Sequence, residues 1–148
     1  MTVLAAIQEA NTAAGIETLS FANIKEFQAF MDSFKFADYP VNIVLPFTSN
    51  GTTLGNGIRK ATIPLNGWVL TRIAEDTNDF RSLAVETAYL EPMRILAITF
   101  IKSLLATDII DNERLPVSDV IRPEYVFLEA HLFGVGYTVN LPIIQNVC

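Results

Sequence analysis

The chain has 148 residues, of which 51% are hydrophobic and only 18% are charged, and its mean hydropathy is +0.36. This length predicts one domain with a substantial core, and no apolar run approaches the roughly 18 residues needed to cross a bilayer. The low charge content predicts that apolar surface is hidden in a subunit interface, with a monomer built around a large core as the alternative. A net charge of −6, with ten scattered Lys and Arg, excludes a basic nucleic-acid footprint.

The cysteine content and the N-terminus indicate the compartment. The only cysteine is Cys148, so no intrachain disulfide can form, and a lone thiol suits a reducing environment. The N-terminus has no basic region before its short apolar stretch, so we expect no signal peptide.

Two helices are predicted at the N-terminus. Thr2 can cap the first, residues 3–14, whose apolar face is small and rich in alanine. Ser20 can cap the second, residues 21–34, in which apolar residues recur at spacings of three and four. The second helix is amphipathic, so we expect it to lie on a sheet.

A strand and an uncharged loop follow the predicted helices. Residues 41–47, VNIVLPF, are almost continuously apolar and predict a buried strand. Residues 48–57, TSNGTTLGNG, contain three glycines and no charge, and they predict a flexible loop.

The loop leads into a predicted hairpin. Asn66-Gly67 is the preferred pair of a type I′ turn and would join strands 59–65 and 68–74. Pro64 would lie at a non-hydrogen-bonded position, which places the first of these strands at an edge of the sheet.

The longest predicted element is a helix over residues 80–105. Its apolar residues recur at spacings of three, four or seven, and its C-terminal half is apolar almost all round. Such a helix needs cover on more than one side, from a sheet and from either a second helix or another subunit. Pro92 either kinks this helix or starts the second of two abutting helices.

A connection of intermediate polarity, residues 107–123, leads to a second predicted hairpin. If Gly134-Val135 forms a type II′ turn, the flanking residues pair apolar with apolar along one face. The elements together are typical of a single α+β domain, residues 1–148, with a mixed or antiparallel sheet of about five strands. We expect the long central helix and the N-terminal helices to pack on one face of that sheet.

No residue pattern typical of catalysis or cofactor binding is found. The glycines of residues 51–57 invite a phosphate-loop interpretation, but the Gly-Lys-Ser/Thr ending is missing and a strand follows, which favours a mobile loop or an assembly arm. His131 is expected to be structural, and the acidic clusters around Asp76 and Asp111 to act in capping and solvation. We therefore expect no enzyme, no cofactor and no metal site.

One side of the central helix carries a stripe of mixed character, formed by Glu91, Arg94, Ile98 and Lys102. Glu91 and Arg94 can form an ion pair at this spacing. The stripe suits either a cover supplied by the N-terminal helices or contact with a neighbouring subunit, and both alternatives stay open.

Several features follow one another in a distinctive order along the chain. They are a helix, a VNIVLPF-type strand, a hairpin approached through a long flexible loop, a central helix ending in FIKSLL, and a closing HLFGVGYTVNLPI hairpin. This order resembles the tail terminator and head–tail joining proteins of long-tailed phages over most of the chain. The resemblance implies a small subunit that forms a ring, a hexamer or a multiple of it, and that has no catalytic residues. Such a ring caps the tail tube, contacts other neck and tail proteins and leaves a channel for DNA.

The sequence thus predicts a virion structural protein that is assembled in the host cytoplasm and makes no membrane contact. Its negative charge would keep passing DNA from binding. The candidate subunit interface is the stripe. The candidate assembly loop consists of Thr48, Asn50, Gly51, Thr52, Thr53, Leu54, Gly55, Asn56 and Gly57.

The alternative function is a small module that binds an apolar ligand between helices and sheet. The residues expected to line that pocket are Phe27, Phe30, Phe34, Trp68 and Phe100.

Overall fold

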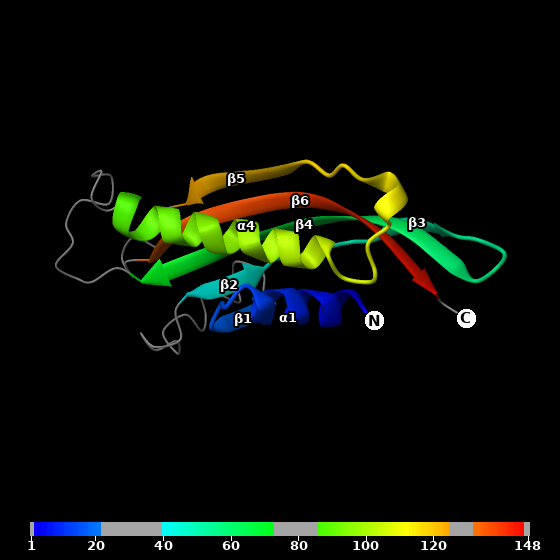
Figure 1. Ribbon diagram of the computed structural model, residues 1–148, viewed down its shortest axis with the longest axis horizontal. Coiled ribbons are helices and arrows are strands. Elements are labelled where there is room, and N and C mark those ends of the chain that lie inside the picture. The colour runs from blue at the N-terminus through cyan, green and yellow to red at the C-terminus, as the bar shows by residue number, and fades with distance from the viewer. Residues whose placement is uncertain (1, 22–39, 73–85, 125–131, 147–148) are drawn as a thin grey trace.

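The computed structural model describes residues 2–21, 40–72, 86–124 and 132–146, which form an elongated molecule with two helices on one face of a sheet (Figure 1). Its elements are α1 (Val3–Ala13), β1 (Thr18–Phe21), β2 (Val41–Val44), β3 (Asn50–Thr53), β4 (Ile58–Arg72), the π-helix η3 (Glu86–Leu90), α4 (Glu91–Leu105), the 3₁₀-helix η4 (Asn112–Arg114), β5 (Asp119–Glu124) and β6 (Leu132–Asn146). The predicted α+β class is confirmed, with a mixed sheet of six strands.

The sheet is built on two long strands, β4 and β6, which pair antiparallel along all 15 residues of each. β2 and β3 pair with the other side of β4, and β5 pairs with the other side of β6. β1 runs parallel to β2, so the strand order is β1-β2-β4-β6-β5 with β3 beside β4.

The predicted turn at Asn66-Gly67 is wrong, because β4 runs through both residues. Gly67 lies opposite Tyr137 of β6 and Val44 of β2. A Cβ atom at Gly67 would collide with the Ile43 carbonyl oxygen and with the Tyr137 ring. The glycine therefore permits close approach of an aromatic side chain and does not form a turn.

The edge position predicted from Pro64 is also wrong, because β4 is an inner strand. On the side of β4 opposite β6, β3 pairs with residues 59–62 and β2 pairs with residues 67–70. Pro64 lies in the interval between these two ladders. The missing N–H of the proline is tolerated there because neither ladder includes it on that side.

The second predicted turn, Gly134-Val135, is wrong for a similar reason, since both residues lie inside β6. Gly134 lies opposite Leu70, and a Cβ atom there would collide with the Val69 carbonyl oxygen. The apolar alternation that predicted a hairpin is instead the alternation of one strand with one face toward the helices.

β1 occupies the start of the predicted second helix. Ser20 and Phe21 are extended and pair with Ile43 and Val44 of β2, so the predicted cap at Ser20 is wrong. The remainder of that predicted helix, residues 22–34, lies outside the described residues. The predicted strand 41–47 is confirmed in its first part, and all four residues of β2 are buried.

The connection predicted over residues 107–123 contains a strand that the sequence analysis missed. β5 starts at Asp119 and pairs antiparallel with β6. Ahead of it, Ile110 forms an isolated bridge with Ile143, so this segment follows the edge of β6 over much of its length.

The first helix begins as its sequence indicates, whereas the predicted start of the central helix at residue 80 lies outside the described residues. The Thr2 hydroxyl oxygen accepts a hydrogen bond from the Ala5 N–H at 3.1 Å and caps α1, and Gly15 follows the helix with a φ of 76°. α4 begins at Glu91 with Pro92 in its first turn, directly after η3. Pro92 thus lies where the chain passes directly from a π-helix into an α-helix, and the choice between a kink and two abutting helices stays a prediction.

The core lies between the helices and the sheet. α4 crosses β4 and β6, and α1 lies beside it on the β2 side (Figure 1). The predicted apolar face of α4 is buried at Met93, Ala97, Phe100 and Leu104. The sheet contributes Ala61, Ile63, Leu65, Val69, Val135, Tyr137, Val139, Leu141 and Ile143. On the opposite face, buried apolar residues gather at the β2 end, namely Val41, Ile43, Trp68, Leu70 and Leu132.

A chain of buried polar side chains links β6, β2 and α1. The Tyr137 hydroxyl donates to Asn42 Oδ1 at 2.8 Å, Asn42 Nδ2 donates to Asn11 Oδ1 at 3.1 Å, and Asn11 Nδ2 donates to the Ile16 carbonyl at 3.3 Å. Burial raises the pKa of Tyr137 although the hydrogen bond to Asn42 lowers it, so the hydroxyl remains a donor. Because buried polar groups are stable only when paired, this chain fixes the position of α1 on the sheet.

Replacing Tyr137 tests this chain. Tyr137→Phe leaves the Asn42 amide oxygen without its donor, and we expect the free energy of unfolding in urea to fall by about 1–3 kcal/mol. Tyr89→Phe, which removes a hydroxyl from a half-buried ring, is the control and should change the free energy of unfolding by less than about 0.5 kcal/mol. Equal losses in the two variants would contradict the role given to the chain.

Glycine substitutions test the two long strands. Gly67→Ala should destabilise the protein by roughly 1–3 kcal/mol or more, because its methyl group meets backbone and the Tyr137 ring. Gly55→Ala, whose methyl group would meet open space, is the control and should cost less than about 0.5 kcal/mol. Thermal or chemical unfolding measures both, and a small effect at Gly67 would be inconsistent with an unbroken β4.

Candidate functional site

The stripe lies on the exposed part of α4. Arg94 Nη1 lies 2.8 Å from Glu91 Oε1, so the predicted pair is present, and the side chains of Arg94 and Glu91 are 56% and 47% exposed. Ile98 is half-buried and Lys102 is exposed. Ile95 borders the stripe and is 59% exposed. The arrangement offers a mixed apolar and charged surface.

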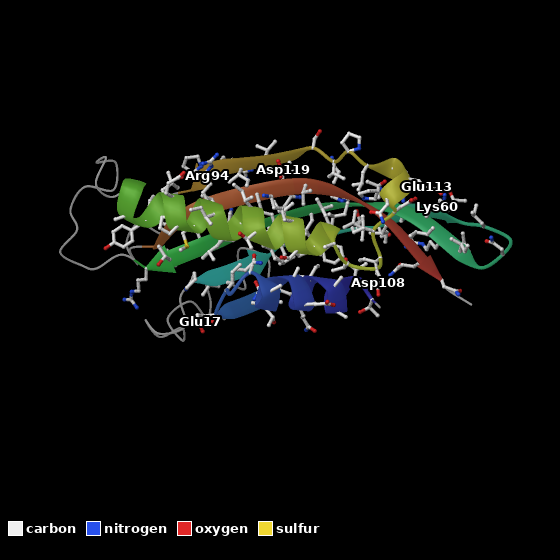
Figure 2. The ribbon with its side chains drawn as sticks, in the orientation of Figure 1. Glu17, Lys60, Arg94, Asp108, Glu113 and Asp119 are labelled. Carbon is white, nitrogen blue, oxygen red and sulfur yellow. The ribbon has the colours of Figure 1, made fainter. Side chains whose placement is uncertain are left out.

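The position of α1 bears on what could cover the stripe. α1 and β5 lie on opposite sides of α4 (Figure 1), and Arg94 extends on the β5 side (Figure 2). Glu91 precedes Arg94 by three residues, and Ile98 and Lys102 follow it at intervals of four, so all of them lie on its side of the helix. α1 therefore does not cover the stripe. The other element predicted to cover the stripe, the second N-terminal helix, lies outside the described part of the chain.

The predicted flexible loop 48–57 is largely a hairpin, so that prediction is wrong. Asn50 to Thr53 form β3, which pairs with β4 from Thr62 to Arg59. The Leu54 N–H donates to the Ile58 carbonyl at 2.7 Å and closes the turn. The actual hairpin of this region thus lies before the position that Asn66-Gly67 predicted.

This hairpin, which we call the arm (residues 48–62), extends beyond the helix layer (Figure 1). Arg59 anchors its base, with Nη1 donating to Ser49 Oγ at 2.8 Å. Gly57 has a φ of 80° in the turn, a conformation that favours glycine. Of the candidate loop residues, Gly57 is half-buried, and the exposed ones are Thr48, Asn50, Gly51, Thr52, Thr53, Leu54, Gly55 and Asn56. The arm is thus exposed, and β3 carries no charged residue.

A cluster around Arg114 was missed in the sequence analysis. Arg114 Nε donates to Asp111 Oδ2 at 2.8 Å, while Nη2 donates to the carbonyls of Ala61 in β4 at 2.8 Å and Ile143 in β6 at 2.6 Å. These two carbonyls belong to directly opposed residues, so the guanidinium bridges the two central strands where the arm begins. The sequence offers only the i,i+3 spacing of Asp111 and Arg114 as a signal.

Asp111 is the anchor of this cluster and is only 3% exposed. Burial raises its pKa, but hydrogen bonds from Arg114 and the Glu113 N–H, together with the charges of Lys60 and Arg114, outweigh burial and hold the pKa below its ordinary value. Lys60 Nζ lies 3.9 Å from Asp111 Oδ2 and 3.7 Å from Glu113 Oε2. The capping role expected for Asp111 is confirmed, since Oδ1 accepts from the Glu113 N–H at 3.1 Å.

An open cavity of about 340 Å³ lies against Arg114. It is lined by Thr62, Arg114, Pro116, Val117, Ser118, Asn140 and Pro142. Most of the donor capacity of the guanidinium is used by Asp111 and the strand carbonyls, and Asp111 neutralises its charge. The cavity therefore lacks the free positive charge that an anion site requires.

The structure gives the positions of only some of the residues considered as metal ligands or catalytic groups. Among the described residues, no three His, Cys, Asp or Glu side chains come together to hold a metal ion. His131 and Cys148 lie outside the described residues. Within the same part of the chain, no helix is long and apolar enough to cross a membrane.

Of the residues proposed to line an apolar pocket, the two that lie in the described part of the chain, Trp68 and Phe100, do not come together. Phe100 packs against Tyr137 on the helix side of the sheet, with ring centroids 5.6 Å apart. Trp68 follows Gly67, which shares the face of Tyr137, so Trp68 lies on the opposite face. Phe27, Phe30 and Phe34 lie outside the described residues.

Comparison with known proteins adds no identification. No protein-family model matches the chain, and no curated protein matches it.

The pKa of Asp111 gives a prediction for pH dependence. Because the folded-state pKa lies below the ordinary 3.8, the stabilisation from Asp111 is present above that value and is lost as the pH falls through the folded-state pKa. The stability difference between the wild type and Asp111→Asn should therefore narrow between about pH 5 and about pH 2 in urea unfolding series. Asp108→Asn, at an exposed position, is the control. A difference that stays constant with pH would refute the prediction.

Proposed function

We propose that the chain is a ring-forming structural subunit of a virion, of the tail-terminator or head–tail connector type, and not an enzyme. The observation that carries the proposal is the arm, a hairpin that extends past the helices and whose edge strand β3 is uncharged and exposed at every residue. Monomeric proteins usually protect such edges with charges, proline or a covering element. An arm without this protection is suited to contact a neighbouring subunit.

The composition and the stripe support the same proposal. Hydrophobic residues make up 51% of the chain, and Leu54 on the arm and Ile95 beside the stripe are 42% and 59% exposed. The arm and the exposed side of α4 each offer a surface to a neighbouring subunit, and contacts between unlike surfaces can close into a ring. A net charge of −6 favours a channel through which DNA passes without being held.

The observations that support the proposal differ from the features on which the sequence resemblance depended. The turns at Asn66-Gly67 and Gly134-Val135, which contributed two of its features, are replaced by the unbroken strands β4 and β6. The proposal therefore rests on the arm, the stripe and the composition. In the proposed virion, the partners of the ring are further copies of the chain and the neighbouring neck and tail proteins.

The oligomeric state tests the proposal. Light scattering and negative-stain images of the purified full chain should reveal rings, expected as hexamers or a multiple of them. A chain that stays strictly monomeric at high concentration would overturn the proposal.

A charge introduced on the arm tests whether the arm contacts a neighbouring subunit. Leu54→Asp should abolish rings while the free energy of unfolding changes by less than about 0.5 kcal/mol, because the side chain is 42% exposed. Val120→Asp, at a position 56% exposed on β5, is the matched control and should retain rings. Rings of wild-type abundance from Leu54→Asp would show that the arm makes no essential contact.

A further inference from the structure

We infer that the stripe, together with the neighbouring open face of β5, receives the α1 side of a second copy of this chain. The inference rests on the proposed ring-forming function and names the subunit interface. It follows from an uncovered surface on one long side of the molecule and from complementary charges on the other.

The receiving surface includes the helix-facing side of β5. Asp119 and Ile121 lie opposite Val139 and Tyr137, two core residues that face the helices. Yet Asp119 is exposed and Ile121 is only half-buried. Thus β5 presents toward the helix layer a face that α4 and α1 leave partly open.

The stripe borders this open face. Arg94 extends on the β5 side of α4, and Asp119 lies along the same long edge of the molecule (Figure 2). Ile98 and Lys102 continue the side of Arg94 along the helix. The receiving surface thus combines a half-buried apolar centre, Ile98 and Ile121, with charged groups at its rim. Among these, Arg94 is paired with Glu91, whereas Lys102 takes part in no salt bridge within the described residues.

The opposite long edge of the molecule carries acidic and apolar groups of α1 and the residues just after it. Leu4 is 50% exposed, and Glu9 and Glu17 are exposed. Figure 2 places Glu17 at the edge opposite Arg94, in the same half of the molecule. Within the described residues neither Glu9 nor Glu17 takes part in a salt bridge, whereas Asp111 and Glu113 pair with Lys60.

The two edges are complementary when copies lie side by side in the same orientation. Arg94 and Lys102 are eight residues apart, about 12 Å along α4, while Glu9 lies within α1 and Glu17 lies beyond its end. The α1 of the second copy would then occupy the side of α4 opposite its own α1 and continue the helix layer over β5. This contact joins two different surfaces, so it closes a ring when the rotation from one copy to the next divides a full turn.

The chemistry of β5 indicates how the copies meet. Its outer edge contains Pro123, which lacks an N–H, and the charged residues Asp119 and Arg122. These features disfavour strand pairing across that edge. The second copy is therefore held through helix side chains and not through an extended sheet.

Charge reversal tests the contact. Lys102→Glu and Glu9→Lys each place like charges across every interface of the ring, and each variant alone should associate at least tenfold more weakly than the wild type. Mixing the two single variants should restore rings, because each contact then joins unlike charges. The double variant should also form rings by itself. Sedimentation velocity and negative-stain images measure all four samples.

Salt and a matched control complete the design. Raising the salt from about 0.1 M to about 1 M shortens the Debye length from about 10 to about 3 Å. The difference in association strength between the wild type and the single variants should therefore become smaller. Val120 lies opposite Thr138 and so faces away from the helix layer, and Val120→Asp therefore controls for a charge added outside the receiving surface. Circular dichroism verifies that each variant is folded. Ile98 is only half-buried within one copy, so part of its side chain is available to the second copy. Ile98→Asp should therefore weaken assembly more than it lowers the free energy of unfolding.

The outcomes separate this inference from the proposed function. If the wild type forms rings and both charge-reversed variants do so equally well, the interface lies elsewhere and only the inference is overturned. If the single variants fail and mixing does not restore rings, the pairing of Glu9 with Lys102 is likewise refuted. A monomeric wild type would overturn the proposed function and the inference together.

Discussion

The pairing of β4 with β6 is the constraint on which the rest of the molecule depends. Each strand has 15 residues, so the pair extends about 50 Å, whereas the 15 residues of α4 extend only about 22 Å. A helix of that length covers less than half of the strands. The end of the pair beyond α4 is joined by β3 and becomes the arm, and Arg114 bridges the two strands where the arm begins.

The sequence predicted the elements with strong local signals and failed where distant contacts decide the structure. The cap at Thr2, the buried face of α4 and the buried strand β2 depend on residues within a few positions of one another. Gly67 and Gly134 carry the local signature of turns, but each is required by a neighbour far away in the chain. A glycine that makes room for Tyr137 cannot be distinguished from a turn glycine without knowing the strand partner.

The candidate site, like the fold, could be predicted from the sequence only in part. The stripe follows from helical spacing, and its Glu91–Arg94 pair is present. The first part of the arm, residues 48–57, stood out by its lack of charge and its glycines. Its order as a hairpin was not foreseen, because β3 exists only through pairing with β4. The Arg114 cluster could not be predicted, since it depends on carbonyls 53 and 29 positions away.

The position of β6 has a consequence for how the protein is made. β6 follows every other described element in the chain, yet it lies between β4 and β5 in the sheet. Until the ribosome has synthesised it, β5 has no partner strand, Asn42 has no hydroxyl donor and α4 lacks half of its support. The nascent chain therefore cannot complete its core during synthesis of the earlier elements, and folding is dominated by late, non-local contacts. The newly made chain consequently exposes the edge of β4 until β6 is available, and an unpaired strand edge of this kind is prone to aggregation.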